Sequence, residues 1–288
     1  MDHAYQEKCT AGVYYEAYLH RKIEKSMAPH YHEPFELCYV IKGKREFMVN
    51  GIVGQIAAGE FLMILPNQIH AFENNDVYNE FWVCKFTADY VPGFASRMAG
   101  MQGTKAVFTC GASIMECCRQ NLFFNERLTL TQWQEFAEPP FTAFSPQERP
   151  PHLLTAQGCL HLICACYMKQ APLEPREEKK EAKARQLISY VSENFRDNIT
   201  LLGAAEALGY SKNYLSRCFH QNYEMHFKQF VNQYRLNYAR KLIHEDKMGI
   251  EKAALESGFG TARNFYRVHK SMTGKTPREM DSRGTGVE

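Results

Sequence analysis

The chain of 288 residues lacks long hydrophobic runs. Its longest aliphatic run, Phe61 to Leu65, is far too short to span a bilayer, which takes about 20 apolar residues. Residues 1–12 contain no apolar stretch of the kind found in a secretory signal peptide. We therefore expect a soluble, cytoplasmic protein that makes no membrane contact.

Paired cysteine spacing is also missing, although the chain has ten cysteines. Cys117 and Cys118 are adjacent, and Cys164 and Cys166 are two apart, so neither pair matches a zinc knuckle or a thioredoxin motif. We expect reduced thiols buried in apolar surroundings, where cysteine behaves as a small hydrophobe. A regulator that senses a metal or a redox change through cysteines stays an alternative, with no pair whose spacing supports it.

The chain also lacks a catalytic nucleophile motif and a phosphate-binding loop. It does have ordinary globular composition and enough length for two domains.

Charge is distributed unevenly along the chain. Residues 180–288 carry 18 Lys/Arg and 12 Asp/Glu, a net charge of +6, whereas residues 1–179 carry a net charge of −4. A basic C-terminal part indicates a polyanionic partner.

Residues 30–90 contain short β-prone runs separated by turn residues, typical of a small antiparallel barrel. Asn50-Gly51 predicts a two-residue hairpin turn, because both residues tolerate positive φ. Helical spacing of apolar residues follows within 111–169. The charged, proline-containing stretch 171–183 predicts a linker, and the chain from Ala184 onward predicts only short helices.

A near-repeat in the C-terminal part is the most informative feature. Ala204–Tyr210 (AAEALGY) matches Ala253–Phe259 (AALESGF). Gly209 and Gly258 lie 49 positions apart, and Arg217 and Arg267 lie 50 apart. One extra residue therefore lies in the second turn.

Each copy has the features of a helix-turn-helix unit. Gly209 or Gly258 can adopt the left-handed conformation and end the first helix, and Ser211 or Thr261 can cap the second. The polar face of the second helix carries Arg and Asn, which read guanine and adenine edges in the major groove. Residues 226–243 predict one long amphipathic helix that holds both units at a fixed distance, suited to major-groove turns about 34 Å apart.

These residues resemble a known family. The second copy follows the pattern Ile250-x3-Ala254-x3-Gly258-Phe259-x5-Phe265-x-Arg267 and then Gly274-Lys275-Thr276-Pro277. The segment of about 184–283 resembles the AraC/XylS family of bacterial regulators. The resemblance implies an activator more often than a repressor, and it implies RNA polymerase as a partner. His269 stands where the family usually has Phe, and we expect it to loosen the second unit.

By position, the resemblance implies base contacts from seven residues, and Lys212 shares their polar face: Asn213, Ser216 and Arg217 in the first unit, and Ala262, Arg263, Tyr266 and Arg267 in the second.

The N-terminal part resembles cupin barrels. His30-x-His32-x3-Glu36-x6-Gly43 matches their first motif, and Gly59-x6-Pro66-x3-His70-x3-Asn74 resembles the second. In metal-binding cupins the residues matching His30, His32, Glu36 and His70 hold a divalent ion, here Zn, Fe or Mn. Regulators of the AraC type commonly use this barrel to bind a small effector, often a sugar, without metal. We expect an effector pocket and no cofactor, with the metal centre as the alternative.

The expected effector pocket has both polar and aromatic walls. Its expected residues are His30, His32, Glu36, Tyr39, His70 and Trp82. Further aromatic residues, Phe35, Phe47, Phe72 and Phe86, are candidate walls that could equally belong to the core.

The sequence therefore predicts an α+β protein, with a cupin-like antiparallel β-barrel carrying helices and an all-α double helix-turn-helix domain. We expect a barrel over 1–95, a helical dimerisation or packing region over 96–170, a linker over 171–183 and a DNA-binding domain over 184–284. The helix-turn-helix units should span about 200–221 and 250–271.

The expected function is a sequence-specific transcription regulator, not an enzyme. Its expected partners are double-stranded DNA, a small-molecule effector, RNA polymerase and a second copy of the chain. The alternative is a metal-dependent cupin enzyme with a helical appendage.

Overall fold

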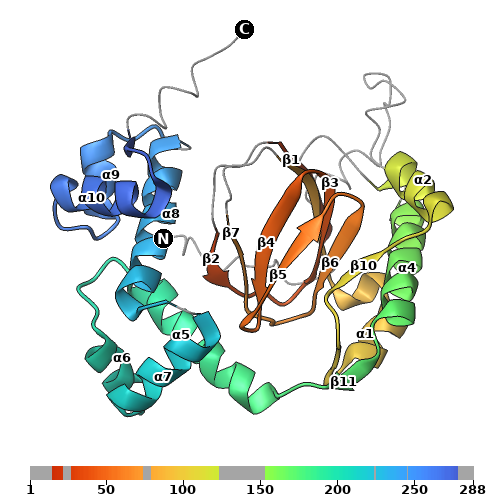
Figure 1. The fold of residues 1–288 in the computed structure, drawn as a ribbon, viewed down its shortest axis with the longest axis horizontal. Helices are drawn as coiled ribbons and strands as arrows, with labels where there is room; N and C mark the ends of the chain where they lie inside the picture. Colours follow the sequence, from red (N-terminus) through yellow and green to blue (C-terminus); the bar gives the residue numbers. More distant parts are fainter. Residues whose placement is uncertain are drawn as a thin grey trace, which may run out of the picture. The chain divides into compact units, whose positions relative to one another are not determined.

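The computed structural model describes residues 15–21, 27–73, 79–122, 153–223, 225–244 and 246–277 (Figure 1). Its contacts divide the chain into two units. One consists of residues 7–26 and 31–181, and the other of residues 1–6, 27–30 and 182–288. Each unit is described by itself below.

Two antiparallel sheets form the β-rich unit. The first has the strand order β1 (Tyr15–Arg21), β8 (Glu80–Phe86), β3 (Phe35–Lys42), β6 (Glu60–Ile64) and β10 (Val107–Thr109). The second has the order β7 (His70–Glu73), β4 (Lys44–Val49) and β5 (Ile52–Ala57). The short strand β2 (Met27–His30) belongs by its contacts to the other unit. A short pair joins β9 (Met101–Gly103) to β11 (Leu173–Pro175).

The predicted hairpin is confirmed. Strands β4 and β5 pair antiparallel up to Val49 and Ile52, with Asn50 and Gly51 between them. Both turn residues have positive φ, 49° and 84°. This backbone twist matches that of the flanking strands, which is why Asn-Gly is favoured there.

Side chains of β3 alternate between two cores. Cys38 and Val40 belong to a core shared with residues of β4, β5 and β7, so they face the space between the sheets. Phe35 and Leu37 belong to a second core on the outer face of the same sheet. Strands β3, β6 and β8 are therefore buried on both faces of the sheet.

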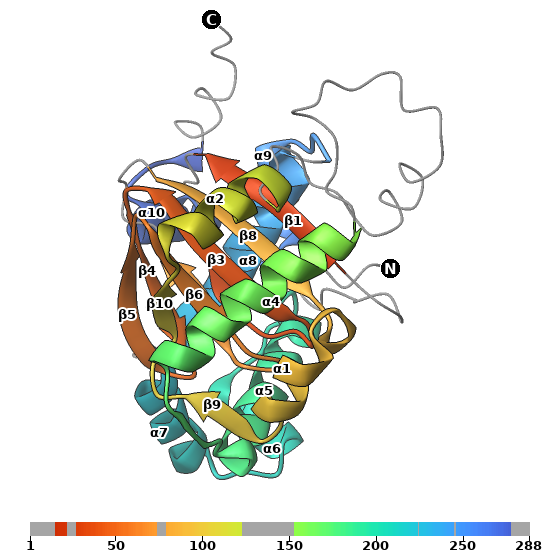
Figure 2. The same cartoon turned by 90° about the vertical axis from the view of Figure 1, so that its right-hand side faces the viewer.

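Three helices supply the second core: α1 (Pro92–Met98), α2 (Ala112–Asn121) and α4 (Leu153–Gln170). Figure 2 shows α4 lying across the face of the sheet, with α2 and α1 beside it. Tyr167 of α4 packs its ring against Phe108 of β10 and Phe94 of α1. A short 3₁₀ turn, Ala88–Tyr90, leads from β8 into α1.

Two of the expected boundaries need correction. The sheet does not end at residue 95, because β10 pairs with β6 through Val107 and Leu62. The stretch 171–183, expected as a linker that runs into a helix, contains a short strand as well as the start of that helix. These are β11 and the start of α5 (Glu178–Asn194), whose Glu181 accepts hydrogen bonds from Arg176 and Asn50. The boundary between the two units falls at residues 181 and 182.

Within described residues 182–277 every regular element is a helix. After α5 come α6 (Leu201–Ala207) and α7 (Lys212–Tyr223), then the long α8 (Phe227–His244), and then α9 (Ile250–Glu256) and α10 (Ala262–Thr273). The pairs α6/α7 and α9/α10 are the two helix-turn-helix units.

Helix α8 packs against both helix-turn-helix units. Its Phe230 meets Phe219 of α7, with ring centroids 4.9 Å apart. Further along α8, Leu236 and Ala239 share a core with Phe265 of α10. The 18 residues of α8 make it about 27 Å long. Each helix-turn-helix unit thus packs on its own part of α8.

The two turns place glycine where the sequence predicts it. Gly209 and Gly258 have φ of 71° and 81°, in the left-handed region. A Cβ on Gly209 would meet nothing within 4 Å, whereas a Cβ on Gly258 would overlap the carbonyl oxygen of Arg196. Gly258 therefore serves both the turn and a close backbone approach.

We expect Gly258→Ala to destabilise the protein more than its matched control, Gly209→Ala. Both changes place a Cβ at positive φ, which costs about 1–2 kcal/mol. Only the first adds a backbone overlap, worth roughly 1–3 kcal/mol more. Urea unfolding followed by far-ultraviolet circular dichroism measures both. Equal losses of stability would contradict the close approach at Arg196.

Candidate DNA-reading face and effector site

The reading helix of the first unit presents all four of its predicted contacts to solvent. Lys212, Asn213, Ser216 and Arg217 are exposed. On the opposite face Leu215 and Phe219 are buried. The predicted cap is present, since the Ser211 hydroxyl accepts a hydrogen bond from the backbone N–H of Tyr214 at 3.2 Å.

The second reading helix, α10, presents Arg263 and Arg267 to solvent, while Ala262 and Tyr266 are half-buried. Its cap, Thr261, accepts a hydrogen bond from the backbone N–H of Asn264 at 3.2 Å. Tyr266 also packs against the core that Phe265 shares with α8. Arg263 and Arg267 are thus the two exposed side chains among the four contacts predicted for this helix.

Asn264 positions Arg267, a role that sequence reasoning missed. The Asn264 side-chain oxygen accepts a hydrogen bond from the Arg267 guanidinium at 2.9 Å. Its amide nitrogen donates to the carbonyl of Phe259 at 3.1 Å. The arginine is therefore tied to the turn of its own unit. The i, i+3 spacing of Asn264 and Arg267 was the available signal.

His269 does not loosen the second unit as expected. It is buried, its ring packs edge-on against Phe265, and Nδ1 lies 2.8 Å from the carbonyl of Lys275. Burial lowers the pKa of His269, and this favours the neutral ring that fits here. Histidine replaces an aromatic ring at this position and adds a hydrogen bond.

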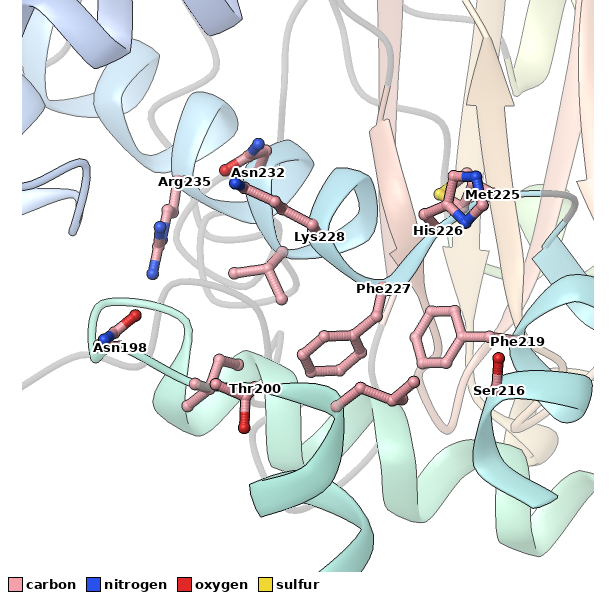
Figure 3. Close-up of a pocket in the computed structure, with 13 residues that line it drawn as sticks. Asn198, Thr200, Ser216, Phe219, Met225, His226, Phe227, Lys228, Asn232 and Arg235 are labelled. Carbon is pink, nitrogen blue, oxygen red and sulfur yellow. The ribbon is translucent and has the colours of Figure 1, made fainter. Parts of the chain in front are cut away.

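A groove of about 720 Å³ lies beside the first reading helix (Figure 3). Phe219, Phe227 and Val231 form its apolar wall. Lys228 and Arg235 are among its polar residues, and none of its described lining residues is Asp or Glu. Two cationic side chains therefore line the groove, and Ser216 of the reading helix lines it as well.

Arg235 braces the loop that precedes the first unit. Its Nε donates to the carbonyl of Phe195 at 2.7 Å, and a terminal nitrogen donates to the carbonyl of Asp197 at 2.8 Å. These bonds join α8 to the chain between α5 and α6. Arg235 is thus occupied with structure, whereas the neighbouring Lys228 is exposed.

A buried polar cluster lies inside the β-rich unit. The Glu36 carboxylate accepts a hydrogen bond from His32 Nε2 at 2.9 Å and lies 3.6 Å from both His70 Nε2 and Lys85 Nζ. All four side chains are almost fully buried. The motif comparison identified His32, Glu36 and His70. It missed Lys85, which comes from β8 and faces the same interior.

The cluster is electrostatically balanced. Burial by itself would raise the pKa of Glu36, but the Lys85 ammonium and the hydrogen bonds from His32 and His70 hold that pKa well below its usual value. Burial lowers the pKa of His32, against the opposing effect of Glu36. The favoured state is a carboxylate paired with an ammonium, with His32 neutral.

The expected metal-ligand set is partly assembled. His32, Glu36 and His70 lie together within the β-rich unit, with Glu36 2.9 Å from His32 Nε2 and 3.6 Å from His70 Nε2. His30 lies in the segment 27–30, which belongs to the other unit. The donor set suits Zn, Fe or Mn. The Lys85 ammonium, however, already gives Glu36 the positive partner that an ion would provide. Asn74, from the second motif, lies outside the described residues.

The prediction that Tyr39 and Trp82 line the same pocket is wrong. They are cross-strand partners on the outer face, where Trp82 belongs to the core under α4 and Tyr39 packs against it. Each is an odd number of residues from its strand's inward charge, Glu36 or Lys85, and successive side chains alternate faces. Phe35 and Phe86 belong to the same outer core, whereas Phe47 and Phe72 face the interior.

Comparison with known families assigns both parts of the chain. Residues 12–119 match the AraC-like ligand binding domain, and residues 204–283 match a helix-turn-helix domain. A ligand-binding barrel followed by this helical domain is the arrangement predicted from the sequence. The chain belongs to the AraC family of transcriptional regulators.

Individual relatives agree with this assignment. The chain is 21% identical over 286 residues to the Msm operon regulatory protein of Streptococcus mutans, covering 97% of this chain and 91% of that protein. It is 32% identical over 127 residues to an HTH-type transcriptional regulator of Staphylococcus aureus, but these cover only 17% of that longer protein. These relatives are regulators, so they favour the regulator over the cupin enzyme.

The fold is shared with a solved structure. ToxT from Vibrio cholerae, in a crystal structure with a bound unsaturated fatty acid, superposes with a TM-score of 0.50 at 13% identity. The match covers 96% of this chain and 98% of that one. It supports the predicted α+β class, with a cupin-like β-rich domain and a helical domain.

Among the described residues, no helix is both long and apolar enough to cross a membrane.

Proposed function

We propose that this AraC-family regulator reads one specific operator through both helix-turn-helix units and activates transcription through RNA polymerase. A polar small molecule bound in the barrel controls it. Activation is the more common action in the family that the sequence resembles. A protein that reads chromosomal DNA in a bacterium works in the cytoplasm, which is the location we propose.

The observation that best supports DNA reading is that both reading helices pack on the same helix, α8. Both reading helices expose Arg side chains while their opposite faces pack on the same helix. An arginine that donates two hydrogen bonds to guanine is the commonest base-specific contact. Arg267 is oriented for such a role by Asn264. We assign base reading to the exposed residues of α7 and α10 and phosphate contact to Lys228 in the groove.

We expect Arg217→Ala to weaken operator binding by about 1–3 kcal/mol and to relax the preference at one base pair. The reason is that a base-reading arginine discriminates, whereas a phosphate contact does not. Fluorescence anisotropy with the operator and a set of single-base variants, taken from the protein's own locus, measures both effects.

Lys228→Ala is the matched control for this experiment. Its loss should weaken all sequences alike and reduce the slope of log affinity against log salt by about 1. If Arg217→Ala showed this same uniform loss, Arg217 would be a phosphate contact. If the wild-type chain showed no preference for any fragment over competitor DNA, the proposed operator reading would be wrong.

The buried cluster of His32, Glu36, His70 and Lys85 is the proposed recognition element for the effector. Buried charged groups hydrogen-bond strongly and discriminate against ligands that leave them unpaired. Hydroxyl groups of a sugar could replace the internal bonds around Glu36. The unsaturated fatty acid bound in the ToxT crystal is a ligand of that protein, and the charges of this cluster favour a more polar molecule.

An effector acts on DNA affinity only if it binds two conformations of the protein differently. His32, Glu36 and His70 of this cluster are also donors that suit a divalent ion, which is the alternative occupant. We favour the polar effector because Lys85 already neutralises Glu36. An ion would have to share the carboxylate with an ammonium group.

We expect a monosaccharide, from a panel screened by thermal shift on the full chain, to raise the melting temperature. Glu36→Gln and His32→Gln should abolish the shift, because each removes a group that bonds the ligand. Zn²⁺, Fe²⁺ and Mn²⁺ are the comparison probes. Near-stoichiometric metal in protein purified without chelator, lost in His70→Gln, would establish a metal centre and overturn the metal-free effector site.

The exposed face of α4 is the proposed dimer contact. Leu154 and Leu162 are 70% and 42% exposed, and Gly158 and Ala165 lie on the same face. These residues are spaced four, four and three apart, which makes one stripe along the helix. Small and apolar residues in such a stripe allow two helices to approach closely.

Leu162→Glu should convert the protein from dimer to monomer, because it places a charge in the centre of this stripe. Light scattering coupled to size exclusion measures the mass, which should fall to the 33.3 kDa of a single chain. Leu255→Glu is the control, since Leu255 is 55% exposed on α9. A wild-type mass of 33.3 kDa would contradict the dimer.

A further inference from the structure

Thiols gather where α2 packs against α4, although nothing in their sequence spacing predicts it. Cys117 and Cys118 of α2 face Cys159 of α4, 42 residues further along from Cys117. The Sγ atoms of Cys117 and Cys159 lie 3.8 Å apart. Cys118 also hydrogen-bonds Cys159 through its thiol. Tertiary packing therefore creates a thiol pair that spacing along the chain does not indicate.

The geometry is close to that of a covalent bridge. A disulfide has an S–S length of about 2.05 Å, so roughly 1.8 Å of approach would close the bond between Cys117 and Cys159. Rotation about χ1 of one side chain supplies movement of this size. Cys117 is half-buried and Cys159 is buried, so the pair lies at the edge of the helix layer and not in its centre.

The surroundings of the pair favour a reactive thiolate. Hydrogen bonds from Cys118 and then Cys117 lower the pKa of Cys159 to about 7, against burial, which raises it. The Asn121 amide donates to the Cys117 sulfur at 3.8 Å. Cys38, buried alone in the barrel interior, is the contrast, because burial raises its pKa to about 12. The thiolate, not the thiol, is the nucleophile.

We propose that Cys117 and Cys159 form a reversible disulfide on exposure to a peroxide, which makes the α2–α4 contact a thiol-based redox site.

The reaction balances with hydrogen peroxide as the only co-reactant. The Cys159 thiolate attacks the peroxide, the O–O bond breaks, and Cys159 becomes a sulfenic acid while the second oxygen leaves as water after taking a proton. The Cys117 sulfur then attacks Cys159, an S–S bond forms, and the hydroxyl leaves as water with the Cys117 proton. Two thiols lose two electrons and two protons, and the peroxide is reduced to two water molecules.

The consequence for regulation rests on the proposed function. A bridge would tie α2 to α4, the helix whose exposed stripe we assign to the dimer contact. Locking α4 would change that contact and with it the affinity for an operator. The disulfide itself depends on neither assignment, so the two can be tested separately.

The first experiment maps the bridge in the full-length protein. The protein is treated with hydrogen peroxide, its remaining thiols are alkylated, and unreduced peptides are fragmented in a mass spectrometer. We expect at least a tenfold rise in the Cys117–Cys159 linkage over untreated protein, reversed by dithiothreitol. The linkage is measured in the wild-type chain, so this experiment does not require any variant to fold.

Variants assign the bridge. Cys117→Ser and Cys159→Ser should each abolish the Cys117–Cys159 linkage. Cys166→Ser, a half-buried thiol of the same helix that hydrogen-bonds Cys110, should retain it. A bridge from Cys159 to Cys118 in the wild-type protein would overturn the assigned partner. Cys218, a half-buried thiol of α7, is the reference for the peroxide dose. If Cys117 and Cys159 were alkylated as fully as in untreated protein at a dose that oxidises half of Cys218, the proposed disulfide would be wrong.

A second experiment tests the regulatory consequence. Operator affinity of the oxidised and reduced wild-type protein should differ by at least threefold, and Cys159→Ser should show no difference. A mapped disulfide without an affinity change would support the redox site and remove its effect on DNA binding. A chain that binds no operator in either state would count against the proposed function while the peptide map decides the disulfide.

Discussion

Burial of strands β3, β6 and β8 on both faces of their sheet organises the β-rich unit. One face meets the second sheet across an apolar interior, and the other lies under α1, α2 and α4. Because successive side chains point to opposite faces, each residue of β3 and β8 must belong to one core or the other. A register shift of one residue would bring Glu36 and Lys85 under the helices and Trp82 into the interior, so the register is strongly specified.

This arrangement places charged side chains on one face of the sheet and an apolar layer with thiols on the other. The inward positions hold a charge-balanced cluster, in which Lys85 compensates the buried carboxylate of Glu36. Removing either partner alone from such a pair leaves a buried charge without compensation, which is strongly destabilising. The outward positions meet an apolar helix layer that contains the thiols of Cys118 and Cys159. The site proposed for an effector and the site proposed for an oxidant thus lie on opposite faces of one sheet.

The helical unit depends on α8 in a comparable way. The first reading unit packs through Phe219 and the second through Phe265, each on a different part of this helix. Arg235 adds a tie to the loop before α6, and Gly258 allows a close approach to the backbone of Arg196. The reading faces are therefore set by what lies behind them. A change in this packing would move the exposed residues of α7 and α10 without replacing any of them.

The helix-turn-helix units could be recognised from the sequence because their determinants are local. A glycine in the left-handed conformation, a capping hydroxyl and an apolar stripe all act within a few residues, so Gly209, Ser211 and Thr261 have the predicted roles. The Asn50-Gly51 hairpin is local in the same sense. The cupin-like motif likewise located His32 and Glu36, which are four residues apart and hydrogen-bonded.

Only the tertiary structure decided which distant residues meet. Lys85 joins Glu36 because the register of β3 and β8 places them opposite each other, and the same register turns Tyr39 and Trp82 away. Cys117 meets Cys159 because α2 packs on α4. The physical reason is that such contacts depend on strand register and helix packing, which are set by the burial of many side chains together. No spacing along the chain encodes them.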